Sequence, residues 1–396
     1  MAVPLLDLRL QYAQVKDDVV RRLDALLESQ QFILGPPVAE LEEAVRAYTG
    51  CGHAVGASSG TDALLAILMA MDIGRGDAVI TTPYTFFATA GCIHRVGAEP
   101  VFVDIDADTY NMHPARLEEC LRKKCRSGPD GRLVTAAGNR VRAIVPVHLF
   151  GCVCDMDRIG ALAAEFDLPV IEDAAQAIGA DYPSRGGKAQ RAGAIGEASY
   201  FSFFPSKNLG AFGDGGMATC RDARLAAQIR LMRNHGMGEQ YHHEKVGGNF
   251  RLDAMQAAIL LAKLPHLDAW HEARRRNAAL YREEFERLGV AERIVLPAEP
   301  YAASGLKNHH IYHQYVVRVP DRDRVRAALA ADGIGCAVYY PVPLHLQECF
   351  APLGHRKGDF PESEKASLET LALPIFPELA PDQIREVAGA LARALG

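Results

Sequence analysis

The sequence has no excess of basic residues and no apolar segment long enough to cross a membrane. Its 396 residues include 43 lysines and arginines against 49 aspartates and glutamates, which gives a formal net charge of −6 at pH 7. Proteins that bind nucleic acid generally carry a basic patch, so this balance argues against a nucleic-acid partner. The longest apolar run, Ala63–Met71, is far shorter than the roughly 20 residues that a membrane-spanning helix requires, and we expect no membrane partner.

Cysteines at the spacing of a metal site are also missing. The nine cysteines are an odd number, and Cys152 and Cys154 form a C-x-C pair without a second pair at zinc spacing. The N-terminal stretch MAVPLLDLRLQYAQ has neither a charged leading region nor a long apolar run, so we expect no signal peptide. We therefore expect a cytoplasmic protein with reduced thiols and no metal site.

Strand-like and helix-like segments alternate through the first half of the chain. The strand candidates are continuous β-branched runs, as in VFVDI, AIVPV and PVIE, and helical patterns such as residues 63–71 and 155–166 stand between them. This alternation predicts an α/β fold with a mostly parallel sheet that is covered on both faces.

The second half of the chain predicts a smaller unit. After a long helical pattern at residues 253–288, a strand is expected at 315–319, a helix at 322–332, a strand at 336–340 and a helix at 381–395. With 396 residues available for two domains, we expect a large α/β domain at residues 1–252 and a small α+β domain at residues 253–396. The polar, turn-rich segment 125–139 interrupts the rhythm and is interpreted as a surface excursion.

Lys207 lies in the stretch YFSFFPSKNLGAFGDGG, between an aromatic strand and a glycine-rich turn. A lysine at the floor of a cleft loses hydration, which disfavours its ammonium form and makes the neutral amine a nucleophile toward carbonyl groups. Ser202 and Ser206 nearby can donate to a phosphate. Taken alone, this lysine fits an ordinary surface loop better than a catalytic site.

Two upstream stretches give Lys207 a context. Gly60 and Thr61 open a predicted helix in the sequence SSGTD, where backbone N–H groups and the helix dipole can hold an anion, although the same residues also cap helices. Asp173 ends a buried strand in VIEDAAQ, at the edge where parallel sheets bind ligands. A buried aspartate needs a cationic partner, and a protonated pyridine nitrogen is one candidate.

In order and spacing, these motifs resemble the sugar aminotransferases of the DegT/StrS family. The matching stretches are GTDALL, TFFATA, VIEDAAQ and SFFPSKNLGAFGDGG, together with NFRLDAMQAAIL (Asn249–Leu260) and YYPVPLH (Tyr339–His345), and they span nearly the whole chain. The resemblance implies the fold type I of enzymes that depend on pyridoxal 5′-phosphate (PLP) and act on nucleotide-linked keto-sugars.

The resemblance also implies a role for each matching residue around the cofactor. Lys207 would be the Schiff-base lysine and the proton shuttle, Asp173 would keep the pyridine nitrogen protonated, and Gln176 would contact the ring hydroxyl. Phe86 would stack on the ring, although it could equally be a core residue. The phosphate would be held by Gly60, Thr61, Ser202 and, from the neighbouring subunit of a homodimer with shared active sites, Asn249.

Substrate contacts follow less directly from the resemblance. The segments that match the substrate side of the family contain Arg251, His242, His243, Tyr340 and His345. The resemblance implies L-glutamate as amino donor and a nucleotide sugar as acceptor, and the NFRLD segment after QYHH favours a 3-keto sugar, UDP- or dTDP-linked, over a 4-keto sugar. A non-catalytic PLP-fold regulator, a dehydratase and an amino-acid aminotransferase remain open as alternatives, although relatives that dehydrate carry histidine in place of Lys207.

Overall fold

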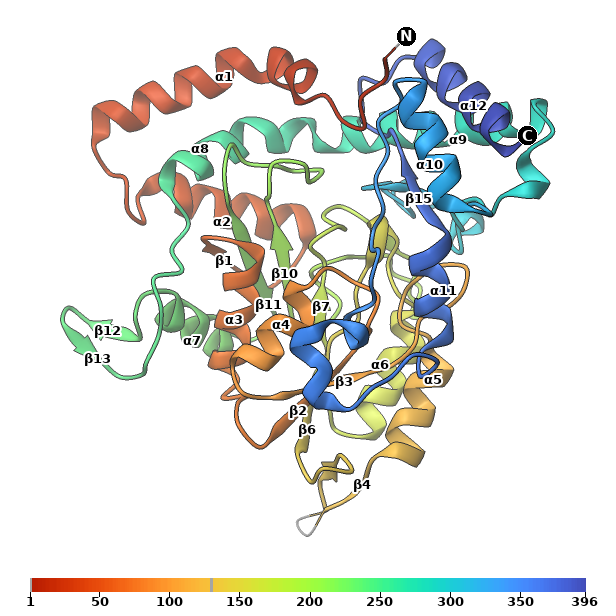
Figure 1. Cartoon of the computed structure of the whole chain (residues 1–396). Coiled ribbons are helices and arrows are strands. Elements are labelled where there is room, and N and C mark those ends of the chain that lie inside the picture. The colour runs from red at the N-terminus through yellow and green to blue at the C-terminus, as the bar shows by residue number, and fades with distance from the viewer. Residues whose placement is uncertain (1, 129–130) are drawn as a thin grey trace.

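A central seven-stranded sheet organises the computed structural model, which describes residues 2–128 and 131–396 (Figure 1). Hydrogen-bonded pairs, together with two bridges from Ile144 to Val170 and from Val147 to Asp173, place the strands side by side. The order across the sheet is β1 (His53–Ala57), β11 (Gly216–Cys220), β10 (Ala198–Ser202), β7 (Ile171–Asp173), β6 (Arg140–Ile144), β2 (Asp77–Thr81) and β3 (Glu99–Phe102). Only β11 among these seven runs antiparallel to its neighbours, which confirms the predicted mostly parallel sheet.

Both faces of this sheet are buried, as the continuous apolar strands predict. Successive residues of one strand enter different hydrophobic clusters: Tyr200 and Ala218 belong to one cluster, whereas their neighbours Phe201 and Met217 belong to another. This separation follows from the pleat, which points alternate side chains to opposite faces.

Helices cover each face. The cluster around Tyr200 packs beneath α3 (Gly60–Ala70), α4 (Ala88–Arg95) and α7 (Ala223–Arg233), and the cluster around Phe201 packs beneath α2 (Pro36–Thr49), α6 (Met156–Glu165) and α8 (Ala254–Lys263). The long helix α1 (Leu8–Ser29) lies across α8 at the top of the view in Figure 1. None of the helices in the described ranges is long and apolar enough to span a membrane.

The C-terminal part of the chain has its own hydrophobic cluster. It is built by α9 (Leu267–Arg287), α10 (Arg322–Ala331), α12 (Pro381–Leu395) and the antiparallel pair β14 (Tyr315–Arg318) and β15 (Thr370–Leu373). Val3 from the N-terminus joins this cluster and bridges to Ile334. The division of the chain at residues 252 and 253 stays a prediction, since α8 packs within the cluster of the large sheet.

The expected strand at residues 336–340 is wrong for most of its length. Only Ala337 pairs with a strand, through two hydrogen bonds to Ala372 of β15. Pro341 and Pro343 follow directly, and because proline has no N–H to donate, the segment cannot extend a ladder. Its partner β15 and the preceding helix α11 (Pro361–Glu369) were not predicted.

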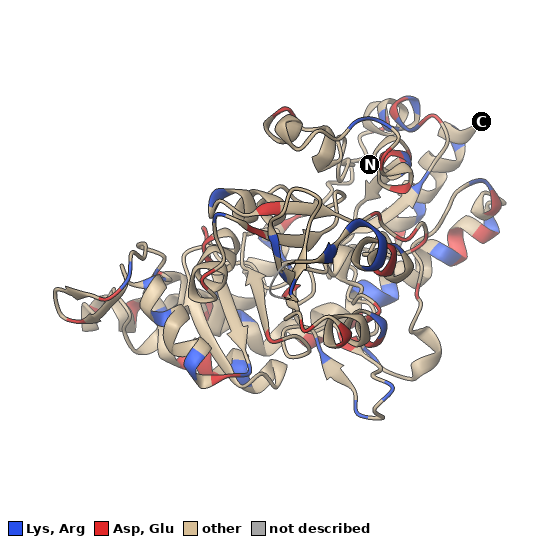
Figure 2. Cartoon of the chain, turned by 90° about the horizontal axis from the view of Figure 1, so that it is seen from below, with Lys and Arg blue, Asp and Glu red and all other residues tan. Residues whose placement is uncertain are grey.

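The excursion at residues 125–139 forms a short hairpin at the amino-terminal end of β6. Its strands β4 (Arg126–Ser127) and β5 (Leu133–Val134) pair antiparallel, and Val134 pairs with Arg140 of β6. Residues 129 and 130 of this segment lie outside the described residues. Seen from below, basic and acidic residues are interspersed over the ribbon rather than gathered into one basic face (Figure 2).

Candidate active site

A cavity of about 650 Å³ lies where the carboxyl end of the sheet meets the C-terminal segment 313–340. The start of α3, the segment before α4, the ends of β7 and β10 and the loop after β10 form its wall. Nine of the residues singled out from the sequence line it: Gly60, Thr61, Phe86, Asp173, Gln176, Ser202, Ser206, Lys207 and Tyr340. Parallel strands end at one edge of a sheet, which is why motifs more than 100 residues apart converge here.

Lys207 is carried by a closed turn that follows β10. Its N–H donates to the carbonyl oxygen of Phe204 at 2.8 Å, and the N–H of Ala211 donates to that of Phe203 at 2.8 Å. Burial of the amine lowers the pKa of Lys207 to about 8, while the negative charge of Asp173 acts in the opposite direction. A large fraction of this amine is therefore neutral near pH 8, as a nucleophile toward an aldehyde must be.

Asp173 ends β7 and is 4% exposed. Its Oδ2 accepts from the Thr89 hydroxyl at 2.7 Å, and its Oδ1 accepts from the N–H of Ala175 at 3.2 Å. Burial together with the charge of Asp173 raises the pKa of Tyr200. Two donors thus hold a carboxylate that lines the same cavity as the amine of Lys207.

The adjacent Glu172 has a different task. Because side chains alternate along a strand, that of Glu172 points away from the cavity. It is completely buried on the opposite face of the sheet. Its carboxylate accepts from the N–H groups of Gly193, Ile195 and Gly196 at 2.8–3.0 Å and lies 2.9 Å from Nε2 of His148. These contacts fix the end of β7 and therefore the position of Asp173.

The N-terminus of α3 forms a cradle for an anion. Ser59 caps the helix by accepting from the N–H of Asp62 at 3.0 Å, and the first N–H groups of the helix point into the cavity end without intrahelical acceptors. A Cβ on Gly216 would lie 2.3 Å from the carbonyl carbon of Ser59, and one on Gly60 would lie 2.8 Å from Cβ of Ser202. Two glycines are thus required for the strand and the helix to approach this closely.

Aromatic and amide groups form the rest of the predicted contacts. Phe86 is 57% exposed at the cavity, with its ring centroid 6.3 Å from that of Tyr340. Gln176 accepts from the N–H of Phe150 at 2.7 Å and donates to the Tyr340 hydroxyl at 3.1 Å. The side chain of Gln176 is therefore fixed at both ends and holds Tyr340 in the wall.

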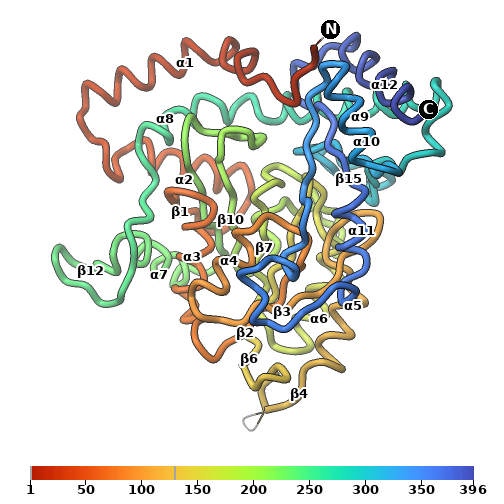
Figure 3. Tube along the Cα trace, viewed as in Figure 1, coloured from red at the N-terminus to blue at the C-terminus, as the bar shows by residue number. Residues whose placement is uncertain are grey.

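Five predicted residues lie outside this cavity, and four of them belong to one region of the chain. His242 and His243 form strand β13 (His242–His243), which pairs with β12 (Met237–Glu239) in an exposed arm that projects away from the sheet (Figure 3). Asn249 follows this arm and bridges to Asn234, and Arg251 donates to the side chain of Asn234 at 2.8 Å. The structure does not bring these residues together with Lys207 of the same chain.

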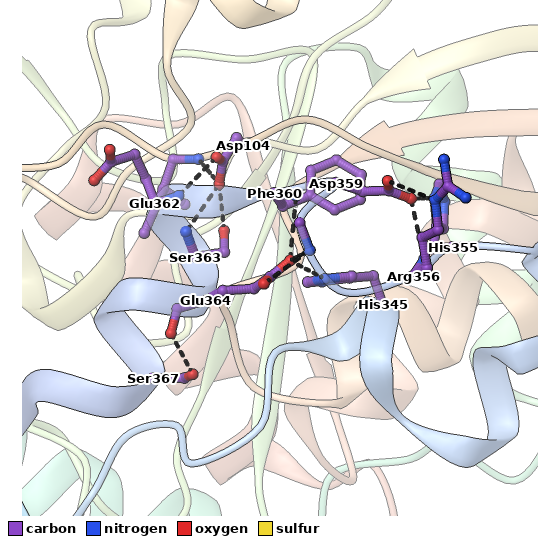
Figure 4. A network of polar contacts seen from close by, with 12 residues as sticks. Asp104, His345, His355, Arg356, Asp359, Phe360, Glu362, Ser363, Glu364 and Ser367 are labelled. Carbon is purple, nitrogen blue, oxygen red and sulfur yellow. Dashed lines mark hydrogen bonds and ion pairs between the residues drawn. The ribbon is translucent and has the colours of Figure 1, made fainter.

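His345 is likewise absent from the cavity wall. It is 1% exposed, and its Nε2 lies 3.0 Å from Oε1 of Glu364 (Figure 4). Glu364 also accepts from the N–H of Gly358 at 2.7 Å, in the network that begins α11. This pairing, 19 residues along the chain, gives His345 a structural contact away from the cavity wall, and its role at the substrate stays a prediction.

Several cavity residues were missed from the sequence. Thr89 lies one helical turn after Phe86, and Tyr200 alternates with Ser202 along β10, so both spacings could have pointed to them. His313 lines the cavity from the C-terminal unit, and its Nδ1 lies 3.0 Å from Oδ1 of Asn208. Burial, with the neighbouring charge of Lys207, lowers the pKa of His313 well below its usual value. No local sequence signal links His313 to Lys207.

The cavity fits PLP. The glycine cradle matches a phosphate, the carboxylate of Asp173 matches a protonated pyridine nitrogen, and the amine of Lys207 matches an aldehyde. This fold and this set of groups define a PLP-dependent aminotransferase. A family model for the DegT/DnrJ/EryC1/StrS aminotransferases matches residues 13–392, and the chain belongs to this family.

Curated relatives match the chain over its whole length. It is 47% identical over 392 residues to a pleiotropic regulatory protein of Geobacillus stearothermophilus, covering 99% of this chain and 98% of the relative. It is 42% identical over 394 residues to the UDP-N-acetyl-3-dehydro-alpha-D-glucosamine 3-aminotransferase of Acidithiobacillus ferrooxidans, covering 100% of this chain and 98% of the relative.

Solved structures of the family share the fold. A DegT/DnrJ/EryC1/StrS aminotransferase from Brucella abortus superimposes with a TM-score of 0.88 at 36% identity, covering 100% of both chains. NtdA from Bacillus subtilis, solved with the bound cofactor PMP, superimposes with a TM-score of 0.87 at 28% identity and covers 100% of this chain and 85% of that one. These matches confirm the predicted fold class, the PLP cofactor and the reaction class of sugar amination.

Proposed function

We propose that this protein transfers an amino group from L-glutamate to a nucleotide-linked keto-sugar. The observation that carries the proposal is the pairing of a buried amine and a buried carboxylate, Lys207 and Asp173, in one cavity beside a helix N-terminus. PLP, when bound, supplies the electron sink that makes the carbon next to the transferred nitrogen acidic.

Different side chains of this protein would bind the cofactor and transfer the protons. Lys207 would hold the cofactor through its aldehyde, and its free Nζ would accept the α-proton of the amino donor and deliver a proton to the sugar carbon. Asp173 would hold the ring nitrogen in its protonated form. Thr89 would keep the carboxylate of Asp173 in place, and Gly60, Thr61 and Ser202 would hold the phosphate.

We propose a 3-keto sugar linked to UDP or dTDP as the acceptor. The support comes from the NFRLD segment and from relatives whose names specify amination at C3: the 42% identical enzyme of Acidithiobacillus ferrooxidans and a dTDP-3-amino-3,4,6-trideoxy-alpha-D-glucose transaminase of Streptomyces venezuelae that is 36% identical. A 4-keto sugar is the alternative acceptor, and the experiment below distinguishes it from a 3-keto sugar.

A homodimer with shared active sites would use the residues that lie outside the cavity. Two exposed apolar side chains, Phe86 and Phe204, line the wall of the cavity, and the exposed Phe212 farther along the Lys207 loop packs edge-on against Tyr12 with ring centroids 5.7 Å apart. Covering such a patch with a second copy would remove apolar surface from water. In that assembly the arm with His242 and His243, together with Asn249 and Arg251, would reach the cavity of the partner.

The test is a panel of UDP- and dTDP-linked 3-amino and 4-amino sugars, incubated with the holoenzyme and 2-oxoglutarate. Loss of the amino group is read as a mass shift of the sugar, with glutamate as the second product. Activity on 3-amino sugars supports the proposal, and activity confined to 4-amino sugars moves the reaction to C4. No turnover of any sugar by a protein that binds PLP would favour the regulatory alternative. Lys207→Ala should be inactive throughout, whereas the exposed Lys188→Ala serves as its control.

A further inference from the structure

One face of α8 contacts the loop that carries Lys207, and neither of the residues involved belongs to the cavity wall. Gln256 and Lys263 are seven residues apart, which places them two turns apart on the same side of the helix. Oε1 of Gln256 accepts from the N–H of Phe212 at 2.9 Å, and Nζ of Lys263 donates to the carbonyl oxygen of Gly210. The helix therefore holds the end of the Lys207 loop at two consecutive points.

Lys263 is an unusual residue to find in this position. It is 2% exposed, and its ammonium lies 5.4 Å from the ring centroid of Phe212. Burying a lysine costs free energy unless its donors are satisfied, and burial here lowers the pKa of Lys263 to about 8. A leucine or methionine would fill the same space without that cost, so the hydrogen bond to Gly210 is the feature that a lysine adds.

The contact at Gly210 is transmitted directly to Lys207. A Cβ on Gly210 would lie 2.2 Å from the carbonyl oxygen of Pro205, which shows that the turn closes on itself with no space between its two ends. Lys207 lies inside this closed turn, and Asn208 ties it to the C-terminal unit by donating to the carbonyl oxygen of Ile311 at 3.2 Å. Movement of Gly210 would therefore move Lys207.

From these contacts we infer that Gln256 and Lys263 are positioning residues for Lys207, through which one face of α8 fixes the turn Pro205–Gly210. Neither residue touches the cavity or the reacting atoms. The inference rests on the proposed role of Lys207, but it concerns the position of this amine rather than the sugar that is aminated.

The experiment uses the full-length chain with Gln256→Ala, Gln256→Glu and Lys263→Met. Gln256→Glu keeps an acceptor for the N–H of Phe212, and Lys263→Met keeps the length of the side chain without its donor. Val387→Ala, which removes buried volume in α12 of the C-terminal cluster, is the control for general loss of stability. Two readouts are measured that do not depend on turnover: hydrogen exchange of the Lys207 and Phe212 amides, and, after removal of PLP, the pH dependence of acylation at Lys207.

We expect Gln256→Ala and Lys263→Met to speed exchange of the Lys207 amide by at least about tenfold, because the turn opens locally. Renewed hydration of the amine should also raise the pH of half-maximal acylation above the midpoint near 8 that burial gives the native loop. Asp173 and His313, the titratable groups that face Lys207, are unchanged in these variants. Gln256→Glu and Val387→Ala should keep the native exchange rate and midpoint.

A native Lys207 exchange rate and a native acylation midpoint in both Gln256→Ala and Lys263→Met would overturn the inference, since a purely structural role predicts lower melting temperatures alone. If Lys263→Met fails to fold, the results for Gln256→Ala alone test the inference. Gln256 is only half-buried, so its replacement should leave the protein folded. A protein that aminates no nucleotide sugar, but in which these variants still loosen Lys207, would refute the proposed function and leave this inference standing.

Discussion

Replacing Gly216 by alanine should weaken the hold on the cofactor phosphate without touching the ring. The added Cβ would lie 2.3 Å from the carbonyl carbon and oxygen of Ser59 and 2.6 Å from the backbone nitrogen of Gly60. The start of α3 must move by about 1 Å before these contacts reach ordinary van der Waals distance, and its N–H groups then no longer point at the anion. A hydrogen bond to a charged group contributes about 1.5–3 kcal/mol, so losing one should weaken PLP binding roughly 10- to 100-fold.

The assay compares two ligands, PLP and pyridoxal, which lacks the phosphate. Titration of the cofactor-free protein, followed by absorbance, should show that Gly216→Ala loses affinity for PLP but retains its affinity for pyridoxal. Gly160→Ala in α6, where a Cβ meets nothing within 4 Å, should bind both ligands as the native protein does. An equal loss for the two ligands, or none for either, would refute the assignment of a phosphate to this cradle.

Three further predictions concern the groups around Lys207. In the cofactor-free protein, acylation of Lys207 should be half-maximal near pH 8, because at pH 7 the neutral fraction of this amine is about 300 times that of an ordinary lysine with a pKa of 10.5; a midpoint near 10 in a pH series would contradict its burial. Asp173→Asn removes the negative charge that raises the pKa of Lys207, so the same midpoint should fall below 8, and an upward shift would show that the sign is wrong. Thr89→Val removes one donor to Asp173 and should weaken cofactor binding roughly 10-fold in a spectroscopic titration, whereas Thr89→Ser keeps the hydroxyl and should bind normally; equal affinities would count against this contact.

The cofactor cradle could be predicted because each part is a local pattern at the end of a strand. Asp173 ends an apolar strand, and Gly60 and Lys207 each follow one in the sequence. The carboxyl ends of parallel strands lie at one edge of the sheet. The chemistry of each residue type then suffices to suggest its role. Most of the α/β alternation followed from the same local patterns of apolar residues.

Other features depend on contacts between distant segments, which no local pattern contains. His345 lies in a stretch that resembles a substrate segment of the family. Its contact with Glu364 of α11 could not be anticipated from the sequence. His313 reaches the cavity only because the C-terminal unit folds back onto the Lys207 loop, where Asn208 meets it. Strand β15 follows a helical pattern directly and is a strand because Tyr315–Arg318 lies beside it.

The contacts of α8 with the Lys207 loop also join segments that are distant in the sequence. The sequence NFRLDAMQAAIL marks Gln256 only as part of a resemblance, and the buried Lys263 looks like an ordinary end to an amphipathic helix. Their roles emerge only when Gly210 and Phe212 are seen against the helix.

The most direct test of this account is to treat the PLP-loaded protein with borohydride and to map the modified residue by peptide mass spectrometry. Borohydride fixes the cofactor on the amine that holds its aldehyde. We expect a single pyridoxyl adduct on Lys207, in the peptide that contains FFPSKNLG, and none in Lys207→Ala. An adduct on another lysine, or an unmodified Lys207 in protein that has bound PLP, would contradict the central claim that this amine and Asp173 form the catalytic site.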